Sequence, residues 1–245
     1  MELKKNIIFT FFNKSSLVRF KSGLLIAVIV AVTGYSCKHK GGKYIDQGEI
    51  HYTIEYMSRT GFMPKEVMPK NLIVSFNKNK MLFDISAPFG SSGILNLTNP
   101  ETGIFDTYIN LLGIRYYYAA KPGENHPGFE AMNGIEIRKT PGTAVICGFN
   151  CKSAEVVLPH SRNKVHKIWY TNEIDVENPN AATPYSEIDG VLMSFFLVIG
   201  NAEMNFEAAT VYKKEIPEKS FERREKYLRV SKNDITEFID KLVSL

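Results

Sequence analysis

A series of short segments in which apolar and polar residues alternate restricts the fold more than any other feature of the chain. In the first segment, Ile50, Tyr52, Ile54 and Tyr56 occupy every second position, and polar residues lie between them. Successive side chains of a strand point to opposite faces of a sheet, so this period of two predicts a strand with one buried face.

Similar segments continue along most of the chain at intervals of about ten residues, which is typical of a mainly antiparallel sheet. The predicted strands lie at residues 50–56, 72–76, 81–85, 94–97, 103–111, 114–119, 136–140, 143–148, 151–158, 165–176, 191–199 and 203–216. Two pairs flank short polar turns, one at residues 77–79 and the other at Gly200-Asn201. Each of these pairs therefore predicts a hairpin.

Only the C-terminal end has a helical pattern, over residues 234–245. The segment 231–234 (SKND) has the form of a capping box, with Asp234 in the place of the usual glutamate. One apolar stripe at helical spacing follows, formed by Ile235, Phe238, Ile239, Leu242 and Val243. The predicted fold class is mainly β (α+β), a curved antiparallel sheet or half-barrel that wraps a helix, with a further helix at the C-terminus.

The first 36 residues have the organisation of a secretion leader. Basic residues extend to Lys21, and the apolar run at residues 24–32 is too short for a membrane span of about 20 residues. The interpretation is a signal peptide over 1–36, a polar tether over 37–46 and a single β-rich domain over 47–245. A short uncleaved anchoring helix is the alternative.

Cys37 follows a small residue at the end of the apolar run, which is where bacterial lipoproteins are cleaved and acylated. We therefore expect Cys37 to carry a lipid anchor, and the protein to lie in the cell envelope, facing the periplasm or the outer membrane. Gly34 departs from the leucine usually found three residues before the cysteine, and an ordinary cysteine near another cleavage point is the alternative.

Charge and motifs exclude several classes of function. The chain has 30 basic and 26 acidic residues, but the leader holds five of the bases and one acid. The remainder is formally neutral, so charge gives no reason to expect a nucleic-acid partner. No metalloprotease, P-loop, dinucleotide-binding or nucleophile-elbow motif is present, and no histidine has a ligand partner at metal-binding spacing. We therefore expect no catalytic residue, metal or cofactor, and a protein that is not an enzyme.

The two remaining cysteines, Cys147 and Cys151, lie four residues apart. In a continuous strand this spacing is about 13 Å, whereas a disulfide needs Cα atoms within roughly 7 Å. Only a turn at Gly148 would allow a bridge, so two separate buried or edge cysteines are the favoured interpretation.

Large apolar side chains occupy both faces of several predicted strands. Five of them are candidates for contact with a hydrophobic ligand: Met81, Phe83, Trp169, Met193 and Phe195. A strand that is apolar on both faces is covered on both. The cover is either an ordinary packed core or an apolar cavity for a hydrophobic small molecule or lipid.

Three segments, at residues 148–156, 170–174 and 188–195, resemble a family of uncharacterised Bacteroidetes envelope lipoproteins that contain a domain of unknown function. The resemblance covers about the last hundred residues best; Gly34 and the additional Cys147 depart from it. It implies a fold similar to periplasmic lipoprotein carriers, with an apolar concavity and no catalytic residues. The expected function is a non-enzymatic envelope lipoprotein that binds a hydrophobic ligand or lipidated partner. A structural or interaction lipoprotein without a ligand is the alternative, and an enzyme with dispersed acidic residues ranks last.

Overall fold

The computed structural model describes residues 39–40, 44–57, 68–87, 92–111, 113–159 and 164–244. The chain divides into two compact units, Met1–Ser36 and Cys37–Leu245, and every described residue belongs to the second unit. The predicted leader and Cys37 lie outside the described residues. No helix among the described residues has the length and hydropathy needed to cross a membrane.

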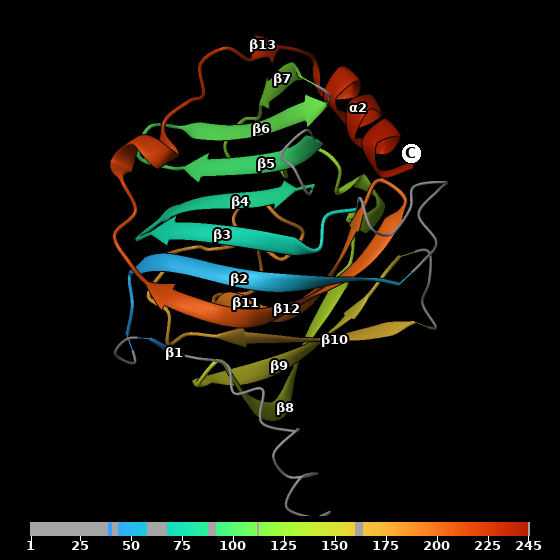
Figure 1. Cartoon of the computed structure of the whole chain (residues 1–245). Coiled ribbons are helices and arrows are strands. Elements are labelled where there is room, and N and C mark those ends of the chain that lie inside the picture. Colours follow the sequence, from blue (N-terminus) through green and yellow to red (C-terminus); the bar gives the residue numbers. More distant parts are fainter. Residues whose placement is uncertain are drawn as a thin grey trace, which may run out of the picture. The chain divides into compact units, whose positions relative to one another are not determined.

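Most of the described chain forms one large sheet (Figure 1). Its strands are β1 (His39–Lys40), β2 (Gln47–Tyr56), β3 (Asn71–Asn77), β4 (Lys80–Ser86), β5 (Ser92–Asn99), β6 (Ile104–Leu111), β7 (Ile114–Ala119), β8 (Glu136–Ile146), β9 (Phe149–Val157), β10 (Val165–Thr171), β11 (Val191–Ile199), β12 (Ala202–Lys213) and β13 (Leu228–Arg229). Two 3₁₀ turns, η2 (Glu130–Met132) and η3 (Glu218–Phe221), and helix α2 (Lys232–Ser244) complete the described elements.

The sheet is open, and its strand order is β13-β7-β6-β5-β4-β3-β2-β12-β11-β10-β9-β8. All neighbours on this path are antiparallel except β13 and β7, and β1 pairs in parallel with β12. Both predicted hairpins are present, as β3–β4 and β11–β12. The predicted class, a mainly β fold with a curved antiparallel sheet and a C-terminal helix, is confirmed.

Several predicted strand boundaries differ from the structure. Residues 136–140 and 143–146 form one strand, β8, because a register shift between Thr140 and Thr143 lets the strand continue past Pro141. Strand β12 ends at Lys213, short of the predicted residue 216. Strand β10 ends at Thr171, short of the predicted residue 176. There the Thr171 hydroxyl donates to the Asn150 carbonyl and accepts from the Glu173 amide, which turns the chain out of the ladder.

The segment predicted as a tether, residues 37–46, contributes to the fold at two places. Strand β1 pairs with Val211 and Tyr212 of β12. Ile45 is 1% exposed, and its carbonyl accepts a hydrogen bond of 2.8 Å from the Asp175 amide. The described part of this segment is therefore attached to the sheet, because burial of the Ile45 side chain is more favourable than its exposure to water.

Helix α2 begins with the predicted capping box. The Asp234 amide donates to Ser231 Oγ at 3.3 Å, and the Ser231 amide donates to the Asp234 carboxylate at 3.1 Å. On the inner face of the helix, Ile235 and Ile239 are fully buried against the sheet. Phe238 is half-buried, and its ring stacks on Tyr116 of β7 with the ring centroids 4.6 Å apart.

Candidate functional site

The structure distributes the five candidate ligand residues over the core and the sheet surface. Met193 and Phe195 are buried in the main core, where the Phe195 ring lies 5.0 Å from Phe206 and 5.5 Å from Tyr52 between centroids. Met81 is buried on β4. The packing around Met193 and Phe195 is that of a filled core.

The other two candidates are only partly buried. Phe83 lies on β4 beside Val74 of β3. Trp169 lies on β10, and the ammonium of Lys167 sits 4.4 Å from the centroid of its ring. The five candidates do not converge on one apolar cavity.

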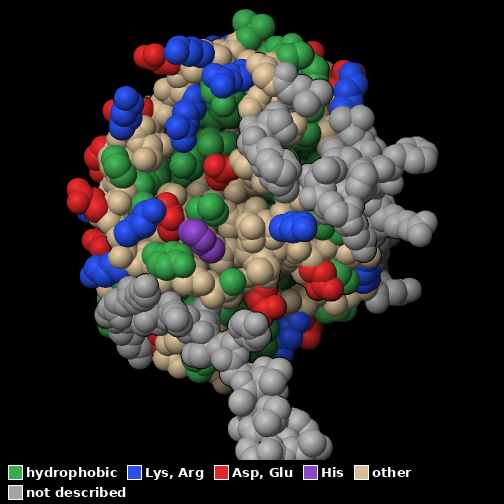
Figure 2. All heavy atoms as spheres, viewed as in Figure 1, with side chains coloured by type: hydrophobic (Ala, Val, Ile, Leu, Met, Phe, Trp, Pro, Cys, Tyr) green, Lys and Arg blue, Asp and Glu red, His purple; other side chains and the backbone are tan. Residues whose placement is uncertain are grey.

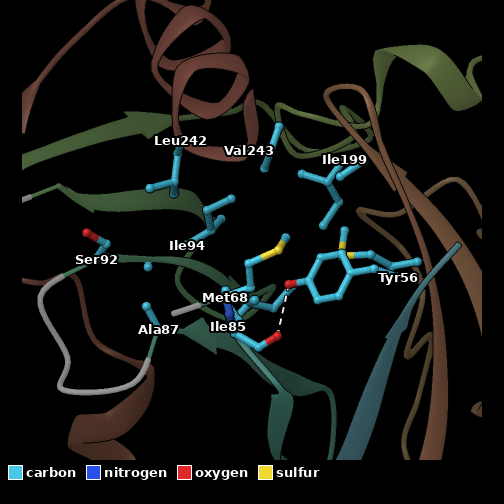
Figure 3. A pocket seen from close by; sticks show the side chains of 13 residues that line it. Tyr56, Met68, Ile85, Ala87, Ser92, Ile94, Ile199, Leu242 and Val243 are labelled. Atoms are coloured by element: carbon cyan, nitrogen blue, oxygen red, sulfur yellow. Dashed lines mark hydrogen bonds between the residues drawn. The ribbon is translucent and has the colours of Figure 1, made fainter. Parts of the chain in front are cut away.

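An apolar pocket lies instead beside α2, between the ends of the β4–β5 and β11–β12 hairpins. Figure 3 shows Leu242 and Val243 reaching from the helix towards Ile94 of β5 and Ile199 of β11. The lining residues are Tyr56, Met68, Pro69, Ile85, Ala87, Ser92, Gly93, Ile94, Ile199, Ala202, Met204, Leu242 and Val243. The cavity has a volume of about 60 Å³.

Polar chemistry is nearly absent from this pocket. The Tyr56 hydroxyl donates to the Pro69 carbonyl at 2.9 Å, so its proton already has an acceptor. Burial raises the pKa of Tyr56 to about 12, which keeps the phenol neutral at physiological pH. No acidic, basic or histidine side chain is among the lining residues. The pocket can therefore discriminate by shape and hydrophobicity, and it carries no acid–base group.

The sequence contained part of the signal for this pocket. Leu242 and Val243 end the helical apolar stripe, while Ile199 and Met204 flank the predicted turn at Gly200-Asn201. The sequence shows that each of these residues is apolar. It does not show that they converge on one pocket, because their convergence depends on where α2 packs against the sheet.

A polar cluster on β2 and β3 contains the residue types of a hydrolase triad but not their order. Both His51 Nε2 and Ser75 Oγ contact the Glu49 carboxylate, at 3.2 Å and 3.3 Å, and Lys214 Nζ lies 2.7 Å from it. Burial raises the pKa of Glu49, but hydrogen bonds from Lys214 and His51 outweigh burial and lower it. A triad needs the histidine between serine and acid, so this cluster does not activate Ser75.

The carboxylate of Glu173, just after β10, has structural partners. Glu173 accepts hydrogen bonds from the Asn150 amide at 3.0 Å and from its side chain at 2.7 Å. Within the described part of the chain, no group of three or more histidine, cysteine or acidic side chains is arranged to hold a metal.

A second buried polar cluster surrounds His126. Its Nε2 lies 3.1 Å from Thr98 Oγ1 and its Nδ1 lies 3.0 Å from Thr107 Oγ1, which donates to Asn96 Oδ1 at 2.9 Å. This arrangement assigns the imidazole proton to Nδ1 and makes Nε2 an acceptor. Burial lowers the pKa of His126 to about 3, against a smaller opposing effect of Glu124. His126 is thus a neutral structural residue.

Cys147 and Cys151 are not bridged to each other, although the chain does turn at Gly148, between β8 and β9. Cys151 is a free, buried thiol, whereas Cys147 is disulfide-bonded. Burial raises the pKa of Cys151 to about 11, so it is a poor nucleophile.

No protein-family model and no curated protein matches the sequence. Among solved structures, the chain is similar to PNGF-II, known from a crystal in space group C2, with a TM-score of 0.50 and 17% sequence identity. The similarity covers 79% of this chain and 32% of the PNGF-II chain, so this chain spans about a third of that protein. At this level of identity the comparison shows a shared fold alone.

Proposed function

We propose that this protein is a non-enzymatic cell-envelope lipoprotein that binds the end of an acyl chain in the pocket beside α2. The acyl chain belongs to a membrane lipid or to a lipidated partner protein. The observation that carries the proposal is the pocket lining, in which eight residues with large apolar side chains surround a cavity without a charged group: Tyr56, Met68, Ile85, Ile94, Ile199, Met204, Leu242 and Val243.

The size of the cavity sets what it holds. A cavity of about 60 Å³ is smaller than the roughly 150 Å³ cavity that binds benzene in an engineered protein core. The pocket therefore accommodates a few carbon atoms of a chain end, and the rest of the ligand lies outside the cavity.

The test is a Leu242→Trp substitution, which fills the pocket from the helix. Protein extracted from membranes is analysed by native mass spectrometry, and binding of a fluorescent long-chain fatty acid is titrated in parallel. We expect bound lipid in the wild type and at least about a tenfold loss of affinity in Leu242→Trp, roughly the loss of 1.4 kcal/mol or more of binding free energy. Glu237→Trp, on the exposed side of the same helix, is the matched control and retains wild-type binding.

A lipid that remains bound to Leu242→Trp refutes this pocket as the site. A wild type that carries no lipid and binds no fatty acid supports the second candidate, a structural or interaction lipoprotein. The packing around Met193 and Phe195 favours that candidate, because both side chains are buried against other apolar side chains of the main core.

A further inference from the structure

Arginine is concentrated at one end of the sheet. Five arginines fall within the described residues, and four of them lie around β6, β7, β13 and the segment that precedes β13: Arg115, Arg223, Arg224 and Arg229. Figure 2 shows basic side chains gathered at the upper edge of the molecule, where Figure 1 places these strands. The Arg–Tyr patch consists of Arg115, Arg224, Arg229, Tyr117 and Tyr227.

Packed tyrosine rings form the base of the patch, with Tyr117 stacked on Tyr108 and Tyr227 edge-on to it. The Tyr108 ring lies 5.7 Å from Tyr117 and 4.9 Å from Tyr227 between centroids. The guanidinium of Arg115 lies 5.9 Å from the centroid of Tyr227. Arg229 is the register partner of Tyr117. Side chains held against rings in this way lose little conformational entropy when they bind a ligand.

Arg223 has a structural role within this region. Its Nε and a terminal nitrogen donate to the fully buried Asp106 carboxylate at 2.7 Å and 3.0 Å. The Tyr108 hydroxyl also donates to Asp106, at 2.8 Å, and accepts from the Arg224 amide at 3.0 Å. This network fixes the chain that carries Arg224 against β6.

The three arginines of the patch are left with unused charge. Among the residues that the structure describes, no carboxylate forms an ion pair with Arg115, Arg224 or Arg229. The Nε of Arg224 is in addition buried without a hydrogen-bond partner among them. A buried donor without a partner costs about 1–3 kcal/mol. The charge of a guanidinium with no ion-pair partner favours an anionic ligand at its exposed atoms.

We propose that the Arg–Tyr patch is a docking surface for an acidic, extended segment of a partner protein. Carboxylates of that segment pair with Arg115, Arg224 and Arg229, since the planar guanidinium matches a carboxylate in a bidentate geometry. Arginine and tyrosine, the two residue types of the patch, are enriched in protein–protein interfaces.

Two other classes of ligand, a sugar chain and an anionic bilayer, fit this surface less well. A sugar chain stacks on free aromatic faces, but Arg115 covers Tyr227, and Arg223 lies 5.7 Å from the Tyr117 centroid. An anionic bilayer would approach from the N-terminal side if Cys37 carries the anchor. Strand β1 pairs with β12, which lies seven strand spacings from β13, on the order of 30 Å along the sheet. A bilayer at the N-terminal side would therefore lie far from the patch.

The test uses detergent-solubilised full-length protein and a fluorescein-labelled synthetic peptide of alternating glutamate and leucine. Alternation places all carboxylates on one face of an extended chain. Fluorescence anisotropy is measured at low and at physiological ionic strength. We expect binding that weakens with salt and falls at least tenfold in the Arg115→Gln/Arg224→Gln variant. The peptide with lysine in place of glutamate is expected not to bind.

Arg138→Gln is the matched control, because this fifth arginine lies on β8 and is paired with Glu136 at 2.8 Å. Arg115→Gln alone, at an exposed position, provides a second variant if the double variant has an altered melting temperature. Absence of peptide binding to the wild type overturns the proposal, as does equal binding to wild type and Arg115→Gln. Arginine-dependent binding of heparin or of anionic vesicles without binding of the peptide also overturns it. None of these outcomes depends on the acyl pocket.

Discussion

At the scale of single residues, the buried polar groups with resolved contacts stabilise the fold. His126 is 2% exposed, and both of its ring nitrogens contact threonine hydroxyls. Asp106 is fully buried and accepts three hydrogen bonds, two of them from Arg223. Both groups are satisfied, so neither has the unused capacity that a catalytic acid or base needs.

The state of His126 leads to a prediction about pH. An unfolded histidine has a pKa near 6.5, whereas the folded pKa of His126 is about 3. Between these values the unfolded chain binds more protons, so the free energy of unfolding decreases as pH falls. We expect His126 to account for a loss of about 1.5 kcal/mol between pH 6.5 and pH 5, which urea unfolding at both pH values measures.

The comparison that isolates this effect uses His126→Gln, with His51→Gln on the surface of β2 as the control. His126→Gln is less stable at neutral pH but loses less stability on acidification than the wild type. Identical pH dependence in the wild type and in His126→Gln would show that His126 titrates in the folded protein as it does in the unfolded chain.

At the scale of elements, α2 both completes the core and forms one wall of the pocket. Ile235 and Ile239 are buried, while Leu242 and Val243 line the cavity one turn later. Ile239 also lies against the loop before η2, since a Cβ on Gly128 would come within 3.1 Å of its Cδ1. The helix is held mainly by Ile235 and Ile239, and the half-buried Phe238 contributes less.

This ranking predicts the effects of substitutions in the helix. Ile239→Ala is expected to lower the free energy of unfolding by about 2–5 kcal/mol, because it leaves a cavity where the sheet meets the helix. Phe238→Ala is expected to cost less, since its ring is partly exposed and gains about 0.5–1.5 kcal/mol from stacking on Tyr116. Denaturant unfolding with Glu237→Ala as the surface control checks the order. A larger effect of Phe238→Ala would reverse the assignment.

At the scale of the whole molecule, the N-terminal side of the domain joins the sheet early. His39, two residues after Cys37, already pairs with Val211. Two residues span at most about 7 Å. A lipid on Cys37 would therefore hold this part of the sheet near the bilayer, with little freedom to rotate.

We predict that Cys37→Ser releases the protein from membranes or blocks its processing, because the variant lacks the sulfur that carries the lipid. Fractionation and the intact mass of the membrane-bound protein measure the outcome. Cys151→Ser, which removes a buried thiol, is the control and remains in the membrane fraction. A Cys37→Ser protein that is processed and membrane-bound rules out the lipid anchor. So does a wild type whose Cys37 sulfur carries no acyl chains or forms a disulfide, because a disulfide and a thioether exclude each other at one sulfur.

The sequence alone determined the local structure of this protein. The period of two in residues 50–56 identified β2, the turn at Gly200-Asn201 identified the β11–β12 hairpin, and the capping box at Ser231 identified the start of α2. These features depend on neighbours within a few residues, where side-chain period and turn chemistry act directly.

Which of these elements meet depends on how the whole chain folds. Strand β2 lies between β3 and β12, although Phe206 and its partner Ile54 are far apart in the sequence. The pocket combines residues from five strands, the segment around Met68 and α2. The Arg–Tyr patch combines β7 with a segment near the C-terminus. A strand that is apolar on both faces, such as β11, has the same sequence pattern beside a filled core as beside a cavity. Only the positions of the covering elements distinguish the two, because burial and cavity volume are properties of the assembled chain.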